Sequence, residues 1–218
     1  KIDEISLINE LKKKGYFFAN IKSLIEELDG NKINLTYVVK LGKKARIKKI
    51  SFIGAKKFKD SKLKNVIISE EYKFWKIISG KKFLNEQIID FDKKLLNNFY
   101  KNKGYYNVKI DSSFANYLGN SDFELVFNIN SNKKYYFNNL SLDLPTDYNL
   151  TNFSELNKIF TKLKGEPYSF NSISEILNEI DKIALSEQYE FLNSTVREKI
   201  TNNQIDFIFN IEELDKFY

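Results

Sequence analysis

Three stretches of the chain place an apolar residue at every second position, and they recur at nearly equal spacing. Their apolar positions are Ile33, Leu35, Tyr37 and Val39, then Phe123, Leu125, Phe127 and Ile129, then Ile205, Phe207, Phe209 and Ile211. Each stretch follows an amphipathic helical pattern that ends at Gly15-Tyr16-Phe17, at Gly104-Tyr105-Tyr106 or at the less similar Gln188-Tyr189. A repeat of this length indicates a small module used in series, whose binding sites are expected at joints and sheet edges.

The composition argues against most catalytic and metal-binding chemistry. The chain has no cysteine, so it has no thiol nucleophile and no thiolate metal site, and no histidine, so the commonest general base and metal ligand is missing. Carboxylate, lysine or serine chemistry stays possible in principle. No phosphate-binding loop or metal-ligand spacing is found either. We therefore expect no enzyme, no catalytic residues, no cofactor and no metal site.

The net charge of +6 raises the alternative of a basic repeat protein that binds nucleic acid. Lysine supplies almost all of this charge, since Arg46 and Arg197 are the only arginines, and 29 acidic residues are interspersed. Arginine is the residue best suited to reading bases and phosphates. We therefore expect no nucleic-acid partner.

The middle of the chain predicts one complete module. The pattern predicts a strand over 46–53 that stops at Gly54, a short helix capped by Asp60 or Ser61, a longer helix over 85–103, and two strands over 108–116 and 122–130. The core face of the longer helix is expected to contain Ile88, Phe91, Leu95 and Phe99, and to be widened by Leu96 and Tyr100. Trp75 is interpreted as a packing anchor, and Asp90 and Asp92 as solvated positions beside Phe91.

The same order of elements recurs in the last third, and its back half occurs in the first. Tyr168 is interpreted as the counterpart of Phe83. The predicted fold class is α+β, with tandem β-α-α-β-β modules that each pack two helices on a three-stranded mixed sheet. We expect the C-terminal half of a module at 1–43, a complete module at 44–132 and a further module at 133–218, in what is a piece of a longer protein.

The residues that recur in this order resemble the POTRA modules of the BamA family, the outer-membrane protein assembly factors of Gram-negative bacteria. The resemblance covers the whole chain and is carried by Arg46-Ile47, Ile50 to Gly54, Phe58, Leu63, Trp75, Asp92, Phe99-Tyr100, Gly104-Tyr105, Val108, Phe127 and Ile129. It implies part of a second POTRA module followed by the third and the fourth.

The resemblance also implies a function. POTRA modules form a periplasmic arm attached to the outer membrane through a C-terminal membrane β-barrel, which is absent from this fragment. The implied partners are unfolded outer-membrane β-barrel proteins, accessory lipoproteins of the assembly complex and the protein's own barrel. The arm of a related secretion or translocation transporter is the alternative within the family.

Two binding sites follow as expectations. In the family the second strand of each module lies at a sheet edge, where an extended client could add by β-augmentation. We expect this client-binding edge at Asn107, Val108, Lys109, Ile110, Asp111, Ser112 and Ser113. The resemblance also suggests an accessory-protein contact at Ile67, Ile68 and Ser69, at the end of the first helix.

Overall fold

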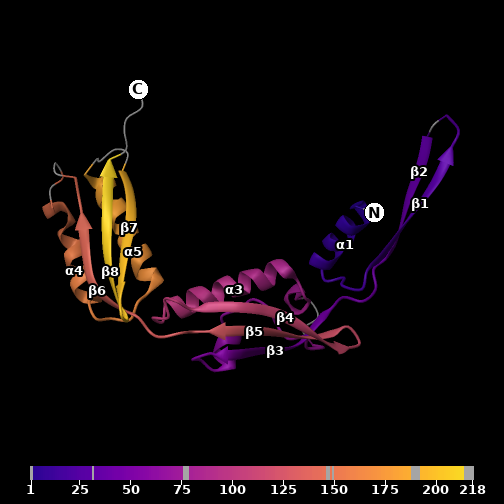
Figure 1. Cartoon of the computed structure of the whole chain (residues 1–218), viewed down its shortest axis with the longest axis horizontal. Helices are drawn as coiled ribbons and strands as arrows, with labels where there is room; N and C mark the ends of the chain where they lie inside the picture. Colours follow the sequence, from indigo (N-terminus) through magenta and orange to yellow (C-terminus); the bar gives the residue numbers. More distant parts are fainter. Residues whose placement is uncertain are drawn as a thin grey trace. The chain divides into compact units, whose positions relative to one another are not determined.

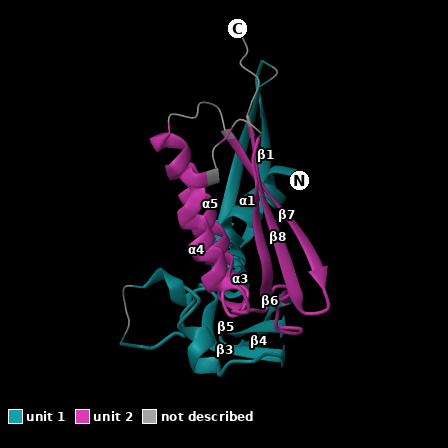
Figure 2. Cartoon of the chain, turned by 90° about the vertical axis from the view of Figure 1, so that its left-hand side faces the viewer, with its two compact units in different colours: residues 1–97, 110–130 teal, residues 98–109, 131–218 magenta. Residues whose placement is uncertain are grey.

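The computed structural model describes residues 2–30, 32–75, 79–145, 148, 150–187 and 192–213. It divides into two compact units, one of residues 1–97 and 110–130 and the other of residues 98–109 and 131–218 (Figure 2). The division falls inside one helix, so the end of that helix and the segment after it group with the last third of the chain. Each unit is described by itself.

The helices and strands follow the predicted order (Figure 1). The helices are α1 (Ile2–Lys13), α2 (Asp60–Lys64), α3 (Glu86–Lys101), α4 (Ser154–Leu163) and α5 (Phe170–Ser186), with 3-10 turns η1 (Gly80–Lys82) and η2 (Leu150–Phe153). The strands are β1 (Asn20–Leu28), β2 (Lys32–Lys40), β3 (Arg46–Ala55), β4 (Lys109–Gly119), β5 (Asp122–Asn130), β6 (Tyr136–Asp143), β7 (Leu192–Thr201) and β8 (Gln204–Glu213).

The strands form three separate sheets, and each sheet lies within one of the three predicted segments. The strand orders are β1-β2, β3-β5-β4 and β6-β8-β7. In the second and third sheets the first strand runs parallel to the last, and β7 runs antiparallel to β8. The predicted α+β class with tandem β-α-α-β-β modules and mixed sheets is therefore confirmed.

The closing strand of each three-stranded sheet occupies its centre and carries the core. In β8 all four alternating apolar residues, Ile205, Phe207, Phe209 and Ile211, are buried. They pack with α4 and α5, which cover one face of the sheet (Figure 2). The equivalent positions of β2 are mostly exposed, because its sheet has two strands in the described part of the chain. Alternation therefore predicts burial only where the module is complete.

The core face of α3 includes the predicted Leu96 and Tyr100, but it contains Asp92 in place of Phe91. Phe91 is 47% exposed, whereas Asp92, Leu96 and Tyr100, spaced four apart, are 0% exposed. The interpretation of Phe91 as core and Asp92 as solvated is therefore wrong. The cause is that apolar residues on two adjoining faces of α3 permit more than one helix rotation.

Asp92 is buried because it accepts backbone hydrogen bonds from the loop after α2. Its Oδ1 lies 2.6 Å from the Ile68 nitrogen and its Oδ2 lies 3.2 Å from the Ser69 nitrogen. Burial raises the pKa of this carboxyl above its ordinary value, although the hydrogen bonds act in the opposite direction. Asp92 thus fastens the α2 loop to α3.

One backbone contact recurs in both units where a helix exit meets the start of the next module. In the first unit the Ala45 N–H donates to the Gly15 carbonyl at 2.8 Å, and in the second the Tyr135 N–H donates to the Gly104 carbonyl at 2.8 Å. Both glycines have positive φ, as expected after a helix C-terminus. The aromatic pairs that follow these glycines are thereby placed beside the next module.

A second pair of contacts corrects the internal alignment. The Leu84 N–H donates to the Ala45 carbonyl, and the Tyr168 N–H donates to the Tyr135 carbonyl, both at 2.9 Å. Tyr168 is therefore the counterpart of Leu84 and not of Phe83.

We expect Asp92→Ala to lower the free energy of unfolding by roughly 2–3 kcal/mol, because two backbone N–H groups lose their acceptor inside the protein. Asp90→Ala is the matched control on the same helix. The Asp90 side chain is 63% exposed and pairs with Lys93 at 2.6 Å. Asp90→Ala is expected to change the free energy of unfolding by no more than about 0.5 kcal/mol. Urea unfolding followed by circular dichroism measures both, and equal effects would contradict the role given to Asp92.

Gly54→Ala is expected to cost roughly 1–3 kcal/mol more than Gly30→Ala. Both glycines have positive φ, so both variants carry the same backbone penalty. At Gly54, however, an added Cβ would lie 2.5 Å from the Ile129 carbonyl oxygen of the neighbouring strand, whereas nothing lies within 4 Å at Gly30. Thermal unfolding of the two variants tests this, and indistinguishable losses would refute the steric argument.

Candidate functional site

The two outer strands of the middle sheet differ in how their free edges are covered. Along β3, the Tyr72 N–H donates to the Ile47 carbonyl at 2.6 Å, and the Ile50 N–H donates to the Glu71 carboxylate at 2.9 Å. The loop after α2 therefore occupies hydrogen-bonding groups that β3 would otherwise offer to another strand. This edge is blocked at Ile47 and Ile50.

The opposite edge is formed by β4. It stands at the end of the order β3-β5-β4, with no strand beyond it in the described part of the chain. A two-residue turn, Asn120-Ser121, joins β4 to β5, and both turn residues have positive φ, as a tight hairpin requires. An edge strand without a neighbour offers N–H and C=O groups to an incoming strand.

The side chains of β4 do little to protect this edge. From Ser112 to Gly119 the strand has no charged residue, and Phe114, Tyr117 and Leu118 are exposed. The corresponding edge strand of the third module, β7, carries the consecutive charges Arg197-Glu198-Lys199. Charged side chains on an edge discourage pairing with other strands. Of these two edges, β4 is therefore the better template.

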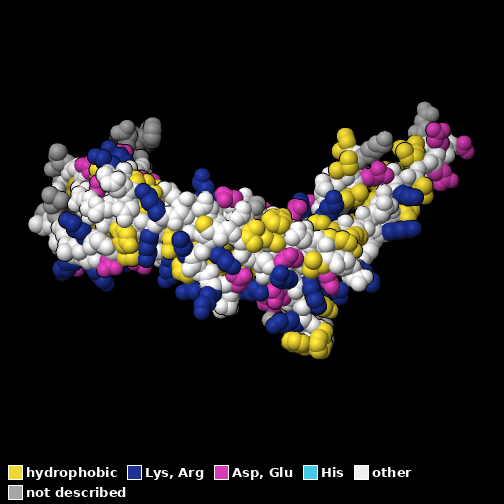
Figure 3. Space-filling view, turned by 60° about the horizontal axis from the view of Figure 1, so that its bottom comes forward, with side chains coloured by type: hydrophobic (Ala, Val, Ile, Leu, Met, Phe, Trp, Pro, Cys, Tyr) yellow, Lys and Arg dark blue, Asp and Glu magenta, His cyan; other side chains and the backbone are white. Residues whose placement is uncertain are grey.

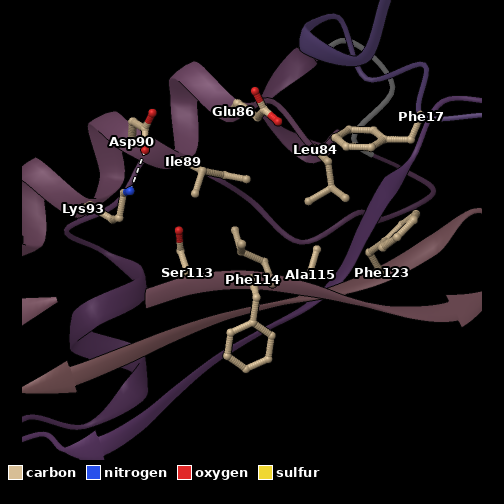
Figure 4. Close-up of a pocket in the computed structure, with 11 residues that line it drawn as sticks. Phe17, Leu84, Glu86, Ile89, Asp90, Lys93, Ser113, Phe114, Ala115 and Phe123 are labelled. Atoms are coloured by element: carbon tan, nitrogen blue, oxygen red, sulfur yellow. Dashed lines mark ion pairs between the residues drawn. The ribbon is translucent and has the colours of Figure 1, made fainter. Parts of the chain in front are cut away.

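A groove of about 450 Å³ runs between β4 and α3 (Figure 4). Ser113 and Ala115 point from β4 toward α3, while the Phe114 ring lies on the other side of the strand. The remaining lining residues are Phe17, Leu84, Glu86, Ile89, Asp90, Lys93, Phe123 and Leu125.

The groove combines an apolar interior with a charged rim. Leu84 and Leu125 are buried, and Ile89 projects into the groove from α3. Asp90 and Lys93 form an ion pair at 2.6 Å on the helix side. Because Ser113 and Ala115 are small, the space beside β4 can take an apolar side chain of a strand paired with this edge.

The predicted client-binding residues divide into two groups. Asn107 and Val108 precede β4, and their backbone is already used. The Val108 N–H donates to the Tyr105 carbonyl at 3.1 Å, and the Asn107 carbonyl accepts from the Asn132 side chain at 2.6 Å. The other five, Lys109, Ile110, Asp111, Ser112 and Ser113, lie in β4, and Ser113 also lines the groove.

The sequence prediction stopped short of the rest of the edge. It omitted Phe114 to Leu118 as well as Phe17, Ile89 and Lys93, which line the groove from outside β4. The uncharged stretch after Asp111 was a usable signal, because an exposed strand without charges is unusual. The contribution of Phe17 depends on packing between distant segments, for which the sequence carries no local signal.

The predicted accessory contact lies beyond α2, which ends at Lys64 and not near Ile67. Ile67 and Ser69 are buried, and Ile68 is half-buried. The nitrogens of Ile68 and Ser69 both donate to Asp92. Ile68 is therefore the side chain of this group best able to meet a partner.

Trp75 does not serve as the packing anchor that the sequence suggested. It is 63% exposed, and its neighbour Phe74 is 78% exposed. The two rings pack edge to face on one another, with centroids 4.6 Å apart. The loop after Tyr72 thus presents an aromatic pair to solvent.

On the face seen in Figure 3, Lys and Arg side chains are interspersed with Asp and Glu. Within the described ranges, no group of three or more Asp, Glu, His or Cys is arranged to hold a metal ion. No helix in the described part is long and apolar enough to cross a bilayer.

Residues 45–132 match the family model of POTRA, described as "Surface antigen variable number repeat". The chain is similar to the outer membrane protein assembly factor BamA of Neisseria meningitidis, at 23% identity over 94% of the chain. It is also similar to BamA of Neorickettsia risticii, at 22% identity over 88%. In each case the chain spans 26% of the relative's length.

Two solved structures share the fold. BamA POTRA3-5 of Haemophilus influenzae matches with a TM-score of 0.55 at 17% identity, covering 97% of this chain and 79% of that one. BamA of Haemophilus ducreyi lacking POTRA domains 1-3 matches with a TM-score of 0.54 at 16% identity, covering 78% of this chain and 29% of that one. Residues 45–132 therefore match the POTRA family model, and the chain as a whole shares the fold of the POTRA modules of BamA, the outer membrane protein assembly factor.

Proposed function

We propose that the chain is part of the periplasmic POTRA arm of an outer-membrane β-barrel assembly protein, attached to the outer membrane in the full-length protein. In this role it receives unfolded outer-membrane proteins by β-augmentation at β4. The observation that carries the proposal is the contrast between the two edges of the middle sheet. The β3 edge is occupied at two positions by Glu71 and Tyr72. By contrast, β4 has no further strand beside it among the described residues and is uncharged over most of its length.

Pairing through the backbone suits a receptor for many clients. Main-chain hydrogen bonds do not depend on the client's side chains, and the groove beside Ser113 and Ala115 accommodates an apolar residue at alternate positions. Each bond contributes about 0.5–1.5 kcal/mol net, so a segment of a few residues binds with an affinity of about millimolar. Weak binding permits the client to be released toward the membrane.

The accessory role is proposed for the surface around Ile68. Asp92 holds the backbone of this loop in place, so the position of Ile68 is set by the module's own core. A partially exposed apolar side chain on a rigid support is a suitable anchor for an accessory subunit.

Titration with an extended β-strand peptide is expected to shift the backbone amide NMR signals of β4 from Lys109 to Gly119. The β7 amides of the same molecule provide an internal control, because that edge is charged. Shifts concentrated on β7, or on residues away from β4 and its groove, would contradict the proposed location.

The triple variant Phe114→Arg, Ala115→Glu, Asn116→Lys transfers the charge pattern of β7 to β4. All three positions are exposed, so the fold is expected to persist, as circular dichroism will show. The affinity for the strand peptide should fall at least about tenfold, because pairing would bury unpaired charges. Unchanged affinity in a folded variant would argue against strand addition at β4.

Ile68→Asp in the full-length protein is expected to reduce binding of an accessory subunit while leaving peptide binding at β4 unaffected. Ile53→Asp, at an exposed apolar position on β3, is the matched control. Co-purification of the assembly complex provides the measurement. Retention of every subunit by the Ile68 variant would remove this part of the proposal.

A further inference from the structure

A second pocket, of about 330 Å³, lies in the first unit, where the link before β3 meets the loop after α2. Its lining residues are Lys43, Lys44, Arg46, Tyr72, Phe83 and Ser121. Three of these six side chains are cationic and none is acidic. The pocket is separate from the groove beside β4, and the proposed client binding does not use it.

Aromatic rings hold the cations at this pocket. The Lys44 ammonium lies 4.9 Å from the Tyr16 ring centroid and 5.3 Å from that of Phe83. The Arg46 guanidinium lies 4.9 Å from the Tyr72 ring centroid. Cation–π contacts at these distances orient a cation without neutralising its charge.

The positive charge exceeds the acidic charge that contacts it. Asp122 pairs with Arg46 at 2.7 Å and offsets one cation. Lys43 is exposed. The pocket is therefore complementary to an anionic group such as a phosphate.

The exposed aromatic pair is close to this pocket along the chain. Tyr72 lines the pocket, and Phe74 and Trp75 follow within three residues, so the Trp75 Cα lies at most about 11 Å from that of Tyr72. The Lys73 ammonium lies 5.8 Å from the Trp75 ring centroid. Tryptophan with neighbouring lysines is the combination that anchors proteins at the headgroup level of a membrane.

We propose that this face of the middle module binds the surface of an anionic phospholipid membrane. A lipid phosphate occupies the pocket of Lys43, Lys44 and Arg46, while Phe74 and Trp75 enter the headgroup region. A membrane fits better than an acidic peptide, because Phe74 and Trp75 are highly exposed instead of lining a groove, and a bilayer contacts them and the pocket together.

Trp75 is the only tryptophan in the chain, so tryptophan fluorescence, excited selectively over the tyrosines, reports on this loop alone. We expect a blue shift of the emission on adding vesicles of phosphatidylcholine mixed with phosphatidylglycerol, and none with phosphatidylcholine alone. The shift should weaken as salt is added, because the attraction is screened. No shift with the anionic vesicles, or equal shifts with both, would overturn the proposal.

The double variant Lys43→Gln, Lys44→Gln is expected to weaken vesicle binding by roughly tenfold or more. The control Lys158→Gln, Lys182→Gln removes the same charge from exposed positions of the third module and should leave binding nearly unchanged. Equal losses in the two double variants would mean that net charge alone acts, which overturns the assigned site.

Phe74→Ser keeps the fluorescent reporter and should reduce both the shift and co-sedimentation with the anionic vesicles. Inorganic phosphate and poly-glutamate serve as soluble anions. If either soluble anion shifts the Trp75 emission while the vesicles do not, the pocket binds anions but the membrane assignment is wrong. Peptide titration of β4 is a separate measurement, so this proposal can fail while the client-binding proposal stands.

Discussion

The hydrogen bonds that Tyr72 and Glu71 make to β3 determine which edge of the middle sheet remains available. A three-stranded sheet has two edges, and both would be open if the loop after α2 lay elsewhere. This loop is itself held by Asp92, which binds the backbone of Ile68 and Ser69 from α3. The open β4 edge therefore follows from how the rest of the module is fastened together, and the same loop goes on to present Phe74 and Trp75.

Both units use the same device where one module leads into the next, although the side chains differ. A glycine with positive φ ends a helix, and its carbonyl accepts a hydrogen bond from the residue just before the following first strand, Ala45 in one unit and Tyr135 in the other. Because the contact is between backbone groups, it tolerates a change from alanine to tyrosine. In the first unit it also brings Phe17 to the end of the groove beside β4, so the joint contributes to the candidate site.

Much of the fold was predictable because burial in a complete module leaves a regular pattern, as in Ile205, Phe207, Phe209 and Ile211 of β8. The order of the helices and strands, the approximate strand boundaries and the turns could be predicted from this alternation and from the positions of the glycines. The rotation of α3 that buries Asp92 and exposes Phe91 was missed, because two adjoining faces of the helix are apolar. No local signal in the sequence marks Asp92 as a buried hydrogen-bond acceptor. The candidate site was predicted only in part, because backbone groups of Asn107 and Val108 already make hydrogen bonds within the protein. The exposure of Trp75 was also missed, because it depends on how the loop after α2 packs and not on the local sequence.

The proposed recognition through the main chain would have a consequence for how such a module diverges. Positions on β4 can exchange one uncharged residue for another and still offer the same peptide groups, whereas Asp92 and Gly54 have few acceptable replacements, because an acceptor or an absent Cβ is needed there. If the chain acts as the proposed receptor, natural selection would act mainly on its internal supports and only lightly on the β4 surface. Two arms could therefore drift far apart in sequence while handling the same range of substrates.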